Sequence, residues 1–60
     1  MILPQDDYIL LSVTNTALRD KFSNFEDLCG EYGWDEAIVS SRLNALGYFY
    51  NRTLNAFVLK

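Results

Sequence analysis

The sequence predicts a small, mainly helical α+β domain in which three helices precede a C-terminal β-hairpin. Apolar residues recur at helical spacing over three successive segments, and capping residues or glycines separate these segments. An aromatic strand-forming run, a cluster of turn residues and a second apolar run complete the chain. A chain of 60 residues has room for one domain only, which we place at residues 1–60.

The first helix is predicted over residues 7–22. Asp6 and Asp7 place negative charge at the positive end of a helix, and Pro4 precedes them. Asn15 lies at the border of the apolar face, where its amide either holds a neighbouring loop or stays half-exposed. The side chains predicted to share the inward sector are Leu10, Leu11, Thr14, Ala17, Leu18, Lys21 and, at its edge, Phe22.

The second helix is predicted over residues 24–32. Ser23 is the expected N-cap, because Glu26 stands three residues later and completes a capping box. Gly33 supplies the left-handed residue that ends the helix. The apolar stripe of this helix consists of Phe25, Leu28, Cys29 and Tyr32.

The third helix is predicted over residues 35–46, with Asp35 as its start signal. Trp34 precedes this cap, so we expect it to pack on Val39 as a hydrophobic staple. Gly47 is expected to end the helix. The predicted buried stripe consists of Val39, Leu43 and Leu46.

A β-hairpin is predicted over residues 48–59, where apolar and aromatic runs flank five turn-forming residues. A four-residue loop at 51–54 places Tyr48 and Phe57 on one face of the hairpin. A five-residue loop pairs Phe49 with Phe57 instead. The residues alone leave this register open.

The predicted order of helix, short helix, glycine-containing turn, helix and hairpin is that of a helix-turn-helix with a trailing wing. Cys29 is small where two helices must approach, Gly33 makes the turn, and Val39 anchors the next helix. Arg42 departs from the pattern, because many such motifs bury an aliphatic residue there. The predicted fold is therefore winged-helix-like, although similar helical pairs also occur in proteins that do not bind DNA.

Charge is distributed unevenly along the chain, whose net charge is −3. Residues 1–36 hold two basic and eight acidic residues, a balance of −6, whereas residues 37–60 hold three basic and no acidic residues, a balance of +3. A DNA-binding protein neutralises roughly six to ten phosphates, so three cations are few. The candidate nucleic-acid contacts are Ser40, Ser41, Arg42 and Asn44 on the third helix and Arg52 on the hairpin.

Residue counts exclude several classes of site. The chain has no histidine and one cysteine, Cys29, which excludes a Ser–His–Asp or Cys–His catalytic arrangement, a Cys/His zinc site and an internal disulfide. We expect Cys29 to be a buried thiol. Glu31, Asp35 and Glu36 are expected to be helix-end charges rather than metal ligands. The chain is therefore expected not to be an enzyme and to need no cofactor, metal or small-molecule ligand.

The N-terminal segment Met1–Asp7 lacks the basic start and the long apolar run of a signal peptide or a membrane span. We therefore expect a cytoplasmic protein that does not enter a membrane. Ile2–Leu3 is a candidate third strand beside the hairpin.

The hairpin carries more aromatic residues than one buried face can hold, so part of this surface is expected to be exposed. The candidate protein-interface residues are Phe49, Tyr50 and Leu54. We therefore predict a non-enzymatic interaction module that binds a protein partner or a second copy of itself. The alternative is a DNA-binding transcriptional regulator of the winged helix-turn-helix class.

The chain resembles a family of short bacterial proteins known as domain of unknown function 4250. The resemblance implies a small, bacterial, intracellular fold and favours the hairpin register that buries Tyr48 and Phe57 together. The family has no established activity, so no functional residue is carried over from it. The residues that carry the resemblance are Leu3-Pro4, Leu10-Leu11-Ser12, Asn15-Thr16, Leu18-Arg19-Asp20, Phe25, Leu28-Cys29, Asp35, Leu43, Leu46-Gly47-Tyr48, Tyr50, Asn55 and Phe57.

Overall fold

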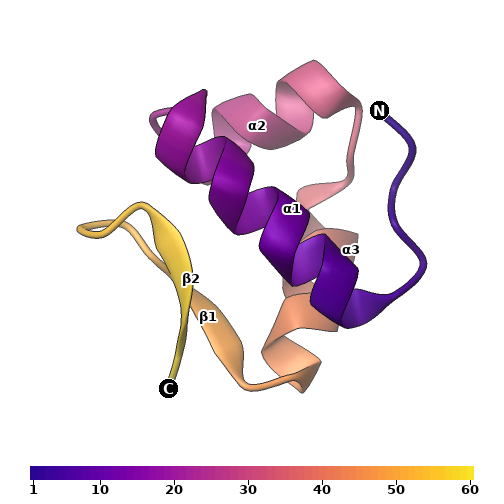
Figure 1. Cartoon of the computed structure of the whole chain (residues 1–60), viewed down its shortest axis with the longest axis vertical. Helices are drawn as coiled ribbons and strands as arrows, with labels where there is room; N and C mark the ends of the chain where they lie inside the picture. Colours follow the sequence, from indigo (N-terminus) through magenta and orange to yellow (C-terminus); the bar gives the residue numbers. More distant parts are fainter.

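The predicted order of elements is confirmed by the computed structural model, which describes residues 1–60 (Figure 1). Three helices come first and a two-stranded antiparallel hairpin follows. The elements are α1 Asp7–Asp20, α2 Phe25–Tyr32, α3 Glu36–Ala45, β1 Tyr48–Asn51 and β2 Ala56–Leu59. No helix has the length and apolar character needed to cross a membrane.

The start of α1 is set by its N-cap, Asp6, whose carboxylate accepts hydrogen bonds from the backbone N–H groups of Tyr8 and Ile9. The helix ends at Asp20, two residues earlier than predicted. Helical spacing predicts that Lys21 lies on the inward sector, and this prediction is wrong because its side chain is exposed beyond the end of the helix. The fully buried residues of α1 are Leu10, Thr14, Ala17 and Leu18.

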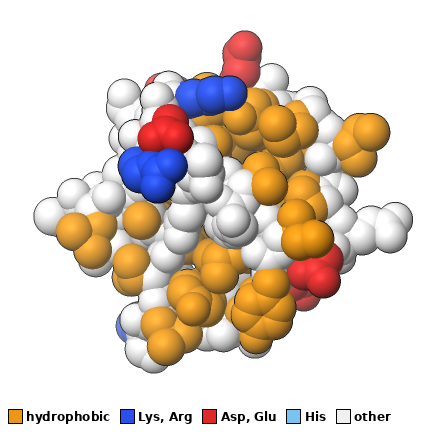
Figure 2. Space-filling model, viewed as in Figure 1, with side chains coloured by type: hydrophobic (Ala, Val, Ile, Leu, Met, Phe, Trp, Pro, Cys, Tyr) orange, Lys and Arg blue, Asp and Glu red, His pale blue; other side chains and the backbone are white.

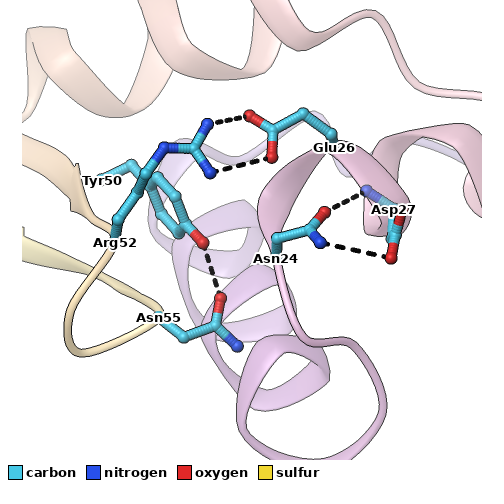
Figure 3. Close-up of polar contacts among 6 residues, drawn as sticks. All are labelled: Asn24, Glu26, Asp27, Tyr50, Arg52 and Asn55. Carbon is cyan, nitrogen blue, oxygen red and sulfur yellow. Dashed lines mark hydrogen bonds and ion pairs between the residues drawn. The ribbon is translucent and has the colours of Figure 1, made fainter.

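The N-cap of α2 is Asn24, not Ser23. The Asn24 side-chain oxygen accepts the backbone N–H of Asp27 at 2.8 Å, and its amide donates to the Asp27 carboxylate at 3.3 Å (Figure 3). The predicted capping box is therefore wrong by one residue, and Glu26 is left to face the hairpin. Gly33 ends the helix in the left-handed conformation, with φ of 71°, as predicted.

A short turn leads from α2 into α3, and Asp35 caps the new helix by accepting the N–H groups of Ala37 and Ile38. Val39 and Leu43 are fully buried and Leu46 is half-buried, as the predicted stripe requires. Gly47 follows with φ of 92°, a conformation that favours glycine, and redirects the chain into β1.

The core lies between the three helices and the inner face of the hairpin. It also receives Trp34, whose indole N–H donates to the carbonyl oxygen of Met1 at 3.0 Å. The N-terminal segment is thereby held against the helices, and Ile2–Leu3 forms no third strand. The buried apolar residues are Leu10, Ala17, Leu18, Phe25, Leu28, Cys29, Trp34, Val39, Leu43 and Phe57.

The hairpin register pairs Tyr50 with Phe57 and Phe49 with Val58, across a loop at residues 52–55. Tyr48 and Phe57 therefore share the inner face, as the four-residue loop and the family resemblance both implied. The loop begins one residue later than the predicted 51–54, so the direct partner of Phe57 is Tyr50 and not Tyr48. The five-residue alternative, which pairs Phe49 with Phe57, is excluded.

Candidate interaction surfaces

Arg42 on α3 is held by the segment that leads into α1. Its Nε donates to the Asp7 carboxylate at 2.6 Å, and one of its terminal nitrogens donates to the Gln5 carbonyl at 2.9 Å. The Arg42 side chain is only 22% exposed. This guanidinium thus joins two parts of the chain that are 35 residues apart, and it does not project freely from α3.

Arg52, on the hairpin loop, forms a two-pronged ion pair with Glu26 at the start of α2 (Figure 3). Its guanidinium carbon also lies 5.5 Å from the centre of the Tyr50 ring. The hydrogen bonds from Arg52 lower the pKa of Glu26 below its ordinary value, and a hydrogen bond from the backbone adds a smaller effect. Both arginines proposed as nucleic-acid contacts therefore already have acidic partners within the chain.

The remaining candidate nucleic-acid contacts lie on α3, where Ser41 is exposed and Ser40 and Asn44 are half-buried. No unpaired cation accompanies them. Among the five basic side chains only Lys21, at the end of α1, and Lys60, at the C-terminus, form no ion pair. The face of α3 proposed to contact DNA thus offers neutral hydrogen-bonding groups without a positive field.

Tyr50, predicted as an interface residue, is half-buried and turned toward the helices. Its ring lies 5.6 Å from that of Phe25 and 5.5 Å from that of Phe57, and its hydroxyl donates to the side-chain oxygen of Asn55 at 2.7 Å (Figure 3). The Tyr50 side chain therefore holds the hairpin on the domain and is not free for a partner.

Phe49 and Leu54, the other two predicted interface residues, are exposed. Phe49 stands on the outer face of the hairpin beside Val58, with 38% of its surface accessible, and Lys60 Nζ lies 5.2 Å from its ring centre. Leu54, at the loop, is 64% exposed. Hydrophobic side chains reach the surface in several other places as well (Figure 2). The outer face of the hairpin differs from these because it belongs to a sheet with no second layer over it.

The two edges of the hairpin expose alternate backbone groups. The Lys60 N–H donates to the Gly47 carbonyl at 3.0 Å, so Gly47 and Lys60 form the first hydrogen-bonded pair of the ladder. Hydrogen-bonded and non-hydrogen-bonded pairs alternate along antiparallel strands. The N–H and C=O groups of Phe49 and Asn51 therefore point into the hairpin. Those of Tyr48 and Tyr50 point away from β2, and no hydrogen bond from another element reaches them.

The corresponding edge of β2 is occupied by a side chain of α1. The Asn15 amide donates to the Phe57 carbonyl at 2.9 Å, and its oxygen accepts the Phe57 N–H at 2.8 Å. Asn15 thus supplies the donor and acceptor that a neighbouring strand would supply, and its amide is engaged rather than free. We call the outward backbone of Tyr48 and Tyr50 the open edge and the Asn15–Phe57 side the closed edge.

Asn55 forms a second link between hairpin and α1. Its amide donates to the carbonyl oxygens of Leu18 and Phe22 at 3.0 and 2.8 Å, so it satisfies backbone groups around the end of the helix. The sequence suggested only a turn residue at this position. In the structure its backbone is left-handed, with φ of 51°, a conformation that Asn and Gly adopt more readily than other residues.

Cys29 is the single thiol of the chain. Burial raises the pKa of the Cys29 thiol to about 11, with nearby carboxylates adding to the shift, so the thiol is protonated at neutral pH. Its side chain is enclosed in the core. No three cysteine, aspartate or glutamate side chains lie close enough together to hold a metal ion.

Comparison with known proteins gives one match. Neither the curated proteins nor the solved structures contain a significant match to this chain. A family model matches residues 4–57, which covers all three helices and the hairpin as far as Phe57. The chain therefore belongs to the family described as domain of unknown function (DUF4250).

Proposed function

We propose that this chain is a non-enzymatic protein-interaction module of the bacterial cytoplasm, and that it binds through β1. The observation that carries the proposal is the contrast between the two edges of the hairpin. A specific amide closes the β2 edge, whereas the β1 edge presents unpaired donors and acceptors beside an exposed aromatic ring.

Exposed strand edges bind extended segments by continuing the ladder. Proteins that must avoid such pairing keep the edge strand very short, or place lysine, proline or a bulge on it. β1, Tyr48–Asn51, is short, but it includes no lysine or proline and pairs with β2 without a bulge. Phe49 adds an aromatic contact on the outer face, which favours burial against a partner. Both features support a binding role for this strand.

Photo-cross-linking in the native host tests this proposal. A benzophenone amino acid at position 49 conserves an aromatic side chain and is expected to form covalent adducts with protein in living cells. The matched control is the same group at Ile2, which is 91% exposed and follows the N-terminus, the chain end that lies away from the hairpin (Figure 1). Absence of protein adducts at position 49, or equal yields at both positions, contradicts the proposal.

DNA binding through α3 is the second candidate, supported by the order of α2, turn and α3. The engagement of Arg42 and Arg52 by acidic side chains weakens it. A titration with duplex DNA distinguishes the two functions, because phosphate contacts strengthen as salt is lowered. We expect no retention at about 50 mM salt. Retention that falls steeply with added salt would favour the DNA-binding alternative.

A further inference from the structure

We infer that the occupant of the open edge is a second copy of this chain, paired through β1 in antiparallel orientation about a two-fold axis at Phe49. This inference rests on the proposed function and names its partner. The outward backbone groups belong to Tyr48 and Tyr50, which stand symmetrically on either side of Phe49.

This arrangement of donors and acceptors is complementary to itself. In an antiparallel pair centred on Phe49, Tyr48 of one copy lies opposite Tyr50 of the other, and the converse pair follows by symmetry. All four of these residues direct N–H and C=O toward the partner, so each pair exchanges two hydrogen bonds. The two copies then form one four-stranded sheet in the order β2, β1, β1, β2.

Other registers use the edge less completely. A two-fold axis at Tyr48 pairs Tyr48 with its own copy and brings Leu46, which precedes the strand, opposite Tyr50. An axis at Tyr50 brings Arg52, in the turn, opposite Tyr48. Only the axis at Phe49 uses both outward positions within the four residues of β1. The strand length therefore selects one register.

The side chain at the axis favours the same pairing. Phe49 and its copy occupy a non-hydrogen-bonded pair, in which the Cα atoms approach to about 4.5 Å. Both rings lie on the outer faces of the hairpins, where they are accessible before association. The segment from residue 37 to 60 contains no acidic side chain, so no carboxylate of β1 meets its own copy at the axis.

The closed edge explains why a second copy pairs with β1 and not with β2. Asn15 already occupies the outward groups of Phe57, which leaves Leu59 as the only outward residue of β2 without such a partner. Pairing of a single residue is insufficient for a sheet. A contact centred on one short strand also buries little area, so we expect a weak, concentration-dependent dimer.

Disulfide trapping tests the predicted register. The expected Cα separation at the axis suits a disulfide, so Phe49→Cys should yield a covalent dimer under mild oxidation. Val58→Cys is the matched control, because it shares the outer face but lies one strand further from the axis in each copy. The native Cys29 is buried, so we expect it to form no disulfide in this experiment. Equal trapping of the two variants, or no trapping of Phe49→Cys, overturns the inference.

Backbone N-methylation tests the hydrogen bonds without changing a side chain, and a 60-residue chain is accessible to chemical synthesis. Methylation at Tyr50 removes an outward donor of the open edge, whereas methylation at Leu59 removes an outward donor of β2. Sedimentation over the micromolar to millimolar range should show dimers for the unmodified chain and the Leu59 analogue. The Tyr50 analogue should be monomeric.

The outcomes separate this inference from the proposed function. A monomer at every concentration, together with cross-links from position 49 to a different protein, overturns self-pairing and leaves the interaction module in place. A monomer with no cross-links overturns both. Cross-linked homodimers together with trapping specific to Phe49→Cys support both.

Discussion

The two edges of the hairpin have the same backbone chemistry but different surroundings. On β2, the outward N–H and C=O of Phe57 are both bound by the amide of Asn15, which lies 42 residues earlier in the chain. On β1, the equivalent groups of Tyr48 and Tyr50 have no such partner. One side chain from α1 thus decides which edge remains available. A two-stranded hairpin is marginally stable alone, so the same contact that closes one edge also fixes the hairpin to the domain.

Removal of Asn15 is expected to have the largest effect, because it abolishes this difference between the edges. Asn15→Ala leaves the N–H and C=O of Phe57, a buried residue, without a partner, and we expect a loss of about 2–3 kcal/mol in the free energy of unfolding. Urea denaturation measures this loss in the free energy of unfolding. Thr16→Ala, at the next and exposed position, should change stability little. Equal stability of the two variants would show that Asn15 does not secure the closed edge.

Loss of the second link, at Asn55, is expected to cost slightly less. Asn55→Gly tolerates the left-handed backbone but removes hydrogen bonds to Leu18, Phe22 and Tyr50, so we expect a loss of about 2 kcal/mol. Hydrogen exchange should increase in β2 and at the end of α1 together. An increase confined to the loop would mean that Asn55 does not join the two elements.

The hydroxyl of Tyr50 provides a smaller test of the inward side of β1. Tyr50→Phe keeps the ring between Phe25 and Phe57 and removes only the hydrogen bond to Asn55, so stability should fall by about 1 kcal/mol. Self-association should be unchanged, because the open edge consists of backbone groups. A loss of dimer in this variant would show that the Tyr50 side chain, and not its backbone, faces the partner.

The ion pair between Glu26 and Arg52 should have the smallest effect, since both side chains are substantially exposed. Because the folded-state pKa of Glu26 is lowered, its contribution is present above the ordinary value of 4.5 and declines as pH falls through the folded value. In Arg52→Gln, the pKa of Glu26 measured by NMR should return toward 4.5. An unchanged pKa would indicate that the pair does not persist in solution.

Local signals predicted most helix boundaries. Asp35 caps α3 and Gly33 ends α2 as expected, and the predicted start signal at Asp6 precedes α1, because each signal acts within one turn of its own residue. The start of α2 is the exception, because the capping-box spacing of Ser23 and Glu26 predicts the N-cap one residue too early. The structure selects Asn24, while Glu26 pairs with a residue of the hairpin loop.

The candidate surface was only partly predictable. Exposure of Phe49 and Leu54 follows from strand alternation and loop position. The acidic partners of Arg42 and Arg52 lie 35 and 26 residues away along the chain. The inward orientation of Tyr50 depends on its packing against Phe25 of α2 and Phe57 of β2. No local pattern specifies which carboxylate an arginine meets. The open edge itself was missed, because a sequence does not show which backbone groups point outward.

By itself, the sequence determined the number and order of the elements and the principal core residues. These follow from periodicity and capping, which are local properties of the chain. Tertiary structure alone decided the exact strand pairing, the role of Asn15 and the difference between the two edges. The physical reason is that a backbone group becomes closed or open only when another part of the chain is brought beside it.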